Sequence, residues 1–129
     1  MPHPYVSIGA PYFSDADPWQ LRKEVIKRLL KADQYLSVNN PHLKLAIFDA
    51  WRPIKVQQYM VQHAIKTELL KRGLTEVDMD GEKYREITNY VYSFWAIPSQ
   101  DRSKPPPHST GSAIDITLVD LNGNYLDMG

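Results

Sequence analysis

A proline-rich loop that turns into a strand constrains this chain more than any other feature. Residues 105–107 are three prolines, which donate no backbone hydrogen bonds and favour an extended, stiff approach to His108. Gly111 favours a turn, and the run 113–119 is typical of a β-strand. We therefore expect a loop and a strand to aim His108 and Asp115, seven positions apart, at one point.

His108 and Asp115 suggest a zinc site, because imidazole and carboxylate groups are natural ligands for that ion. A strand aspartate among apolar neighbours is costly to bury without a partner, and a cation is one such partner. The alternative is a loop histidine and an aspartate that caps a turn, which the spacing alone does not exclude. A catalytic zinc usually has three protein ligands, and nothing after Asp115 supplies a third of the expected type. The sequence therefore suggests a metallohydrolase with part of its site missing.

Arg52 is the second candidate for a functional role. It lies between Trp51 and Pro53, where a predicted strand meets a predicted helix. A guanidinium there is suited to binding a carboxylate or stabilising an oxyanion. A salt bridge to Asp49 or a stack on Trp51 is the alternative. Three further histidines are expected to be surface or packing residues: His3, His42 and His63.

The remaining patterns predict one domain, 1–129, in three parts. Residues 1–16 are expected to form an extended arm, 17–95 a region of helices and a strand, and 96–129 the candidate metal loop and a hairpin. Asn122 and Gly123 are a hairpin turn signal. The predicted helices are 17–39, 53–73 and 82–95, and the predicted strands are 43–48, 113–119 and 125–128.

Two of these helices have apolar residues at helical spacing, which predicts one buried face on each. Asp17 and Pro18 are expected to cap and start the first helix. Its predicted buried stripe is Leu21, Val25, Leu29, Ala32 and Leu36, and that of the last helix is Tyr84, Ile87, Val91 and Phe94.

Composition excludes several classes of function. The net charge is zero and like charges form no long block, so we expect neither nucleic acid nor a membrane surface as a partner. The absence of cysteine excludes disulfides, thiolate nucleophiles and cysteine zinc sites. No apolar run is long enough for a transmembrane helix. The first residues lack the pattern of a signal peptide, so a cytoplasmic location is expected, with the periplasm not excluded.

Taken together, these motifs resemble those of the D-alanyl-D-alanine dipeptidases, zinc peptidases related to the enzyme of vancomycin resistance. The resemblance covers nearly the whole chain, and the combined motif is more specific than either half. It is carried by Phe-Asp-Ala-Trp-Arg-Pro at 48–53 with Gln57 and Gln58, His-Ser-Thr-Gly-Ser-Ala-Ile-Asp at 108–115, Leu-Asp-Met-Gly at 126–129, and the opening 3–12.

The resemblance implies an α+β fold, with helices packed against a small antiparallel sheet. It implies that His108 and Asp115 hold zinc and that Arg52 stabilises the tetrahedral intermediate of D-Ala-D-Ala hydrolysis, a step in cell-wall dipeptide turnover. The family's third zinc ligand and catalytic glutamate lie in a later Glu-x-x-His motif, which this chain lacks. We therefore expect the chain to be the N-terminal portion of such an enzyme.

Three interpretations remain open at this stage. In the first, the chain is the N-terminal portion of a zinc dipeptidase that a downstream segment or a complementary C-terminal fragment completes. In the second, it is a non-catalytic fragment or binding module. The third interpretation is a metal-free domain in which Asp115 finds a partner within the protein. The sequence does not identify residues that bind the substrate.

Overall fold

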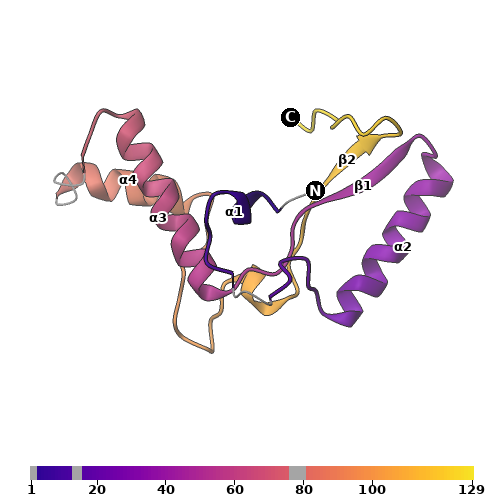
Figure 1. The fold of residues 1–129 in the computed structure, drawn as a ribbon, viewed down its shortest axis with the longest axis horizontal. Coiled ribbons are helices and arrows are strands. Elements are labelled where there is room, and N and C mark those ends of the chain that lie inside the picture. Colours follow the sequence, from indigo (N-terminus) through magenta and orange to yellow (C-terminus); the bar gives the residue numbers. More distant parts are fainter. Residues whose placement is uncertain (1–2, 13–15, 76–80) are drawn as a thin grey trace.

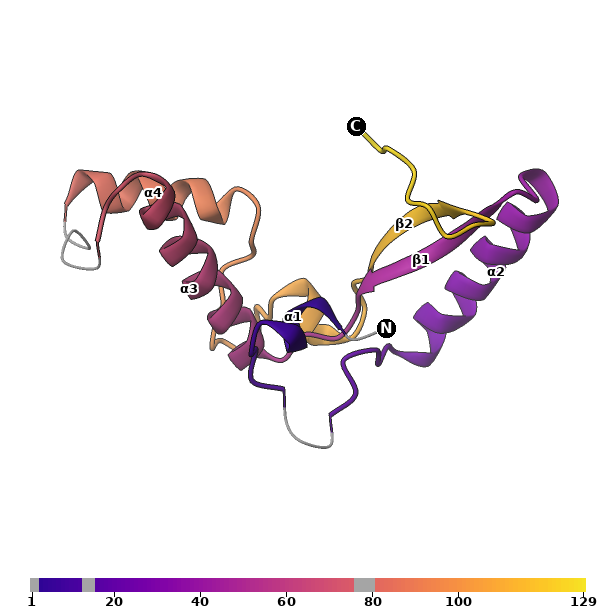
Figure 2. The same cartoon turned by 45° about the horizontal axis from the view of Figure 1, so that its top comes forward.

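The computed structural model describes residues 3–12, 16–75 and 81–129. It has the α+β class that the resemblance implies, with helices and one two-stranded antiparallel sheet. Two lobes flank a central segment that contains α1 and the short 3₁₀ helix η2 (Figures 1 and 2). In chain order the elements are α1 (Pro4–Ser7), α2 (Lys23–Asn39), β1 (Leu43–Asp49), α3 (Ile54–Lys71), α4 (Glu82–Tyr92), η2 (Pro107–Thr110) and β2 (Asp115–Asp120).

The helical lobe consists of α3 and α4, which pack against each other. Pro53 caps the start of α3 and Gly73 follows its end with a φ of 68°, so both predicted limits are confirmed. The prediction for Phe94 was wrong: it is 72% exposed, because α4 ends at Tyr92 and the chain turns there. The buried core residues of this lobe are Val61, Ile65, Leu69, Ile87 and Val91.

The sheet lobe consists of α2, β1 and β2, with α2 beside the sheet (Figure 1). No residue of α2 is fully buried. Of the predicted stripe, Ala32 is exposed and the prediction for it was wrong, whereas the other four residues are partly buried. None of the helices in the described ranges is long and apolar enough to cross a membrane.

The structure corrects two predictions near the N-terminus. The arm contains a helical turn, α1, rather than only extended chain. The first long helix begins at Lys23 instead of Pro18, because Asp17 accepts a hydrogen bond from the Trp19 amide (2.8 Å) and forms a turn of its own. The Arg22 amide then donates to the Gly111 carbonyl at 2.9 Å, so a tertiary contact sets where the helix starts.

The C-terminal hairpin is only partly as predicted. The turn is present: the Asn122 and Asn124 amides both donate to Asp120 Oδ1 at 2.8 Å, and Gly123 has a φ of 84°. The predicted returning strand 125–128 was wrong, since Tyr125 forms only an isolated bridge to the end of β2. The Asp120 carboxylate gathers these amides into a wide turn in place of a two-residue hairpin.

Candidate functional site

A β-bulge brings two carboxylates together at the end of the sheet. Ile47 pairs with Ile116, and the next pair is Asp49 with Asp115, so Phe48 is the additional residue. Bulges re-aim side chains and often lie beside functional sites. Here Asp49 is fully buried, whereas Asp115 is 51% exposed on its side chain.

His108, in η2, is held against the segment that directly follows β1. The Arg52 amide donates to the His108 carbonyl (3.1 Å), and the Ser109 hydroxyl donates to the Arg52 carbonyl (2.7 Å). His108 Nδ1 lies 2.8 Å from the Ala50 carbonyl oxygen. A carbonyl only accepts, so Nδ1 carries a proton, and in the neutral ring the Nε2 lone pair is left available. Histidines that bind metals are usually oriented by such a bond.

The imidazole and the strand carboxylate meet as the sequence predicts. His108 Nε2 lies 3.4 Å from Asp115 Oδ1. Two acceptors face each other at this point, and a cation or a proton between them would relieve their repulsion. Imidazole nitrogen with carboxylate oxygen is a donor set that suits zinc, so these two residues fit a metal ion.

Asp49 is a member of this cluster that sequence reasoning missed as a metal-site residue. One ligand atom from each of Asp49, His108 and Asp115 lies within 4.8 Å of the others. Both Asp49 oxygens already accept bonds, however, from His3 and from Arg52. Asp49 thus belongs to the cluster and, through these bonds, also positions its neighbours. The one signal in the sequence that could have indicated Asp49 is its position directly after the predicted strand 43–48.

Arg52 is buried, with 5% of its surface exposed, and it is held from several sides. Its Nε donates to Asp49 Oδ2 at 3.1 Å, its Nη2 contacts the same oxygen, and its Nη1 donates to Gln57 Oε1 at 2.6 Å. The guanidinium carbon lies 5.1 Å from the Tyr5 ring centre and 5.0 Å from that of Trp95. The ion pair with Asp49, one of the two alternatives for Arg52, is thus present. The aromatic rings beside the guanidinium are those of Tyr5 and Trp95, whereas the sequence suggested Trp51.

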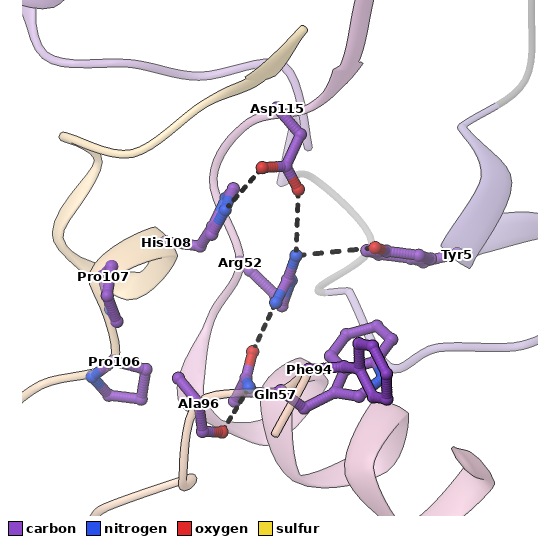
Figure 3. Close-up of a pocket in the computed structure, with 10 residues that line it drawn as sticks. Tyr5, Arg52, Gln57, Phe94, Ala96, Pro106, Pro107, His108 and Asp115 are labelled. Atoms are coloured by element: carbon purple, nitrogen blue, oxygen red, sulfur yellow. Dashed lines mark hydrogen bonds and ion pairs between the residues drawn. The ribbon is translucent and has the colours of Figure 1, made fainter. Parts of the chain in front are cut away.

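The guanidinium also faces a small cavity. Figure 3 shows Nη2 directed toward the Tyr5 hydroxyl (3.5 Å) and Asp115 Oδ2 (3.8 Å). Burial raises the pKa of Tyr5 to about 12, so its phenol is a neutral hydrogen-bond donor at physiological pH. The cavity has a volume of about 300 Å³ and is lined by Tyr5, Arg52, Gln57, Phe94, Trp95, Ala96, Pro106, Pro107, His108 and Asp115.

The other histidines differ in their surroundings. His42 and His63 are exposed, and His63 stacks on Tyr59 with ring centres 6.3 Å apart. His3 is buried and donates from Nε2 to Asp49 Oδ1 at 3.0 Å. Burial lowers the pKa of His3, with the Asp49 carboxylate opposing that shift. His3 is therefore buried, not on the surface, and it borders the site.

Comparison with known proteins places the chain in a family. A family model described as D-Ala-D-Ala dipeptidase matches residues 1–129. The chain is 43% identical over 128 residues to a D-alanyl-D-alanine dipeptidase of Synechocystis sp., a match that covers 99% of this chain and 51% of that protein. It thus spans about half the length of the curated relative, and no solved structure was found to match it. The chain belongs to the D-Ala-D-Ala dipeptidase family.

Proposed function

We propose that this chain provides the N-terminal half of the active site of a zinc-dependent D-alanyl-D-alanine dipeptidase. One observation carries the proposal: the Ala50 carbonyl fixes the His108 ring so that Nε2 faces the Asp115 carboxylate. The family match and the activity for which the Synechocystis relative is named supply the substrate. The small cavity beside these residues is consistent with a dipeptide.

His108 and Asp115 are the residues that would hold the ion. When bound, zinc supplies Lewis acidity, which lowers the pKa of water to about 7 and polarises a carbonyl group. Asp115 is half-exposed, so its carboxylate is accessible from the cavity. A nitrogen and oxygen ligand set also accepts cobalt, nickel or iron, and the measurement of metal content below distinguishes them.

Arg52 is the residue that would stabilise negative charge on the reacting carbonyl oxygen. A guanidinium has five N–H groups, and Asp49 and Gln57 occupy three of them. Nη2 also donates to the Tyr5 hydroxyl oxygen at 3.5 Å, which leaves one N–H for a ligand in the cavity that Arg52 lines, and the Tyr5 O–H is itself a neutral donor. Donors fixed before the reaction contribute roughly 3–4 kcal/mol each in well-studied hydrolases, because they need no reorganisation.

The third metal ligand and the general base are proposed to come from the half of the dipeptidase that the match does not cover, called the complementary half here. The support is that the chain covers only half of the Synechocystis dipeptidase, while a catalytic zinc site usually needs three protein ligands. Glutamate is the base that the family resemblance implies. In this proposal the present chain binds and orients, and the complementary half completes proton transfer.

A chimera tests the proposal. Residues 1–129 are joined to the part of the Synechocystis dipeptidase that lies beyond the match, and metal content and D-Ala-D-Ala hydrolysis are measured. One zinc per molecule and measurable turnover are expected. The His108→Ala chimera should lose both, whereas Arg52→Lys should keep the zinc and lose roughly a hundredfold to a thousandfold in kcat, the cost of one misplaced oxyanion donor.

The control is His63→Ala, which removes an exposed histidine from α3 and should change neither readout. A folded chimera that holds zinc but does not hydrolyse the dipeptide would favour the binding module instead. A folded chimera without metal would overturn the assignment of His108 and Asp115.

A further inference from the structure

His3 is a buried titratable side chain that the proposed reaction does not use. It lies 46 positions before Asp49 in the sequence, yet its Nε2 is 3.0 Å from Asp49 Oδ1. Three aromatic rings surround the imidazole, with centre-to-centre distances of 5.3 Å to Tyr5, 5.5 Å to Tyr12 and 4.6 Å to Trp19. The imidazole is thus enclosed by aromatic rings, and its Nε2 is directed toward the Asp49 carboxylate.

The contacts of His3 select one tautomer. The Tyr5 backbone amide, which only donates, lies 3.2 Å from His3 Nδ1. Nδ1 must therefore be the acceptor, and the single ring proton is on Nε2, where it is donated to the Asp49 carboxylate. The first turn of α1 thus fixes the donor that faces Asp49, because this amide belongs to α1.

Asp49 connects this donor to the guanidinium. Its Oδ1 accepts from His3, while its Oδ2 accepts from Arg52 Nε and Nη2. A carboxylate held at one oxygen has a fixed rotation, so its other oxygen has a fixed position. A neutral donor does this without adding charge, and the ion pair of Asp49 with Arg52 stays balanced in a place where charge is expensive to bury.

We propose that His3 is a positioning residue that, in its Nε2–H tautomer, orients Arg52 through the Asp49 carboxylate. The importance of this for catalysis rests on the proposed role of Arg52, but the orientation itself does not. The short N-terminal helix is therefore part of the active-site machinery, although no atom of His3 lines the cavity.

The tautomer is tested first, on the 129-residue chain without substrate or metal. Ring nitrogen NMR of His3 at neutral pH should show an unprotonated Nδ1 and a protonated Nε2. The opposite tautomer, or a doubly protonated ring, would overturn the proposal.

Two variants then separate positioning from packing. His3→Phe keeps an aromatic ring in the enclosure but removes the donor, and His3→Gln restores an N–H of similar reach. The exchange of the Arg52 Nε–H with solvent should become at least roughly tenfold faster in His3→Phe, the loss expected of a charge-assisted bond, and return toward the original rate in His3→Gln.

Internal and external controls accompany the exchange measurement. The amide of Ile87, in the buried core of the helical lobe, should keep its rate, which shows that the chain stays folded. His63→Phe, at an exposed histidine that stacks on Tyr59, should leave Arg52 unchanged. If His3→Phe leaves the Arg52 exchange rate unaltered, His3 only packs and the inference fails.

Activity of the chimera separates this inference from the proposed function. His3→Phe should lower kcat with little change in KM, and His3→Gln should recover part of it, since the guanidinium acts on the reacting oxygen. Slow exchange in an inactive chimera would contradict the proposed function while leaving the positioning role intact. An active chimera whose kcat is indifferent to His3→Phe would contradict the positioning role alone.

Discussion

The two lobes solve the problem of burial differently. In the helical lobe, α3 and α4 enclose five buried apolar residues, and Ile87 has no exposed surface. In the sheet lobe no residue of α2 is buried, and the sheet residues Ile47 and Phe48 remain 43% and 49% exposed. The comparison teaches that the helical lobe encloses a core of its own residues, whereas the sheet lobe leaves apolar side chains exposed to solvent.

The exposed sheet surface includes a groove next to the centre of the molecule. It has a volume of about 620 Å³ and is mostly apolar. Apolar surfaces of this kind typically mark interaction sites, and the proposed complementary half is a suitable partner for it. The residues that line it are Pro4, Trp19, Leu45, Ala46, Ile47, Phe48 and Tyr125.

The largest effect on stability is expected at the buried ion pair of Asp49 and Arg52, which lies between the two lobes. Arg52→Met should lower the free energy of unfolding by about 3–5 kcal/mol, because it leaves the buried Asp49 carboxylate without its ion-pair partner. Urea unfolding measures this. Arg72→Met is the matched control: Arg72 pairs with Glu68 and lies over the Tyr90 ring, but it is exposed, so less than about 1 kcal/mol is expected. Equal losses in the free energy of unfolding would mean that the buried pair of Asp49 and Arg52 contributes no more to stability than the exposed pair of Glu68 and Arg72.

Two isoleucines test the contrast between the lobes directly. Ile87→Ala should cost about 2–5 kcal/mol, because it leaves a cavity in a closed core. Ile47→Ala should cost less than about 1 kcal/mol in this chain, since much of that side chain is already in water. Thermal and urea unfolding of both variants give the comparison. In the chimera the cost of Ile47→Ala should rise, and an unchanged cost would mean that the sheet face stays uncovered.

A smaller effect is expected at alkaline pH. Burial raises the pKa of Tyr5 to about 12 and that of Tyr12 in the same direction, above the ordinary value of 10. The unfolded chain therefore loses these protons first. Their contribution to stability is complete below pH 10 and decreases as pH rises toward 12. Tyr5→Phe should flatten this decline, and Tyr125→Phe, at an exposed ring, should not. A decline that is as steep in Tyr5→Phe would place its origin elsewhere.

Local patterns in the sequence predict much of the fold. The limits of α3 and the approach of His108 to Asp115 follow from proline, glycine and alternating residues close together in the chain. The features that could not be predicted from the sequence depend on residues far apart in the chain. The start of α2 is set by a bond from Arg22 to Gly111, and the burial of His3 by contact with Asp49. No periodicity in the sequence around Arg22 or His3 indicates either contact.

His108 and Arg52 would also respond differently to accumulated mutations. The His108 ring is oriented by the carbonyl of residue 50, a main-chain atom that every amino acid would supply there. Arg52 is oriented by side chains alone, at positions 49 and 57 and, through the first of these, at position 3. Single codon changes can erase any of them. If mutations accumulated without selection for activity, the Arg52 guanidinium would lose its orientation early. The His108 ring would keep its orientation for as long as the backbone at residue 50 kept its conformation.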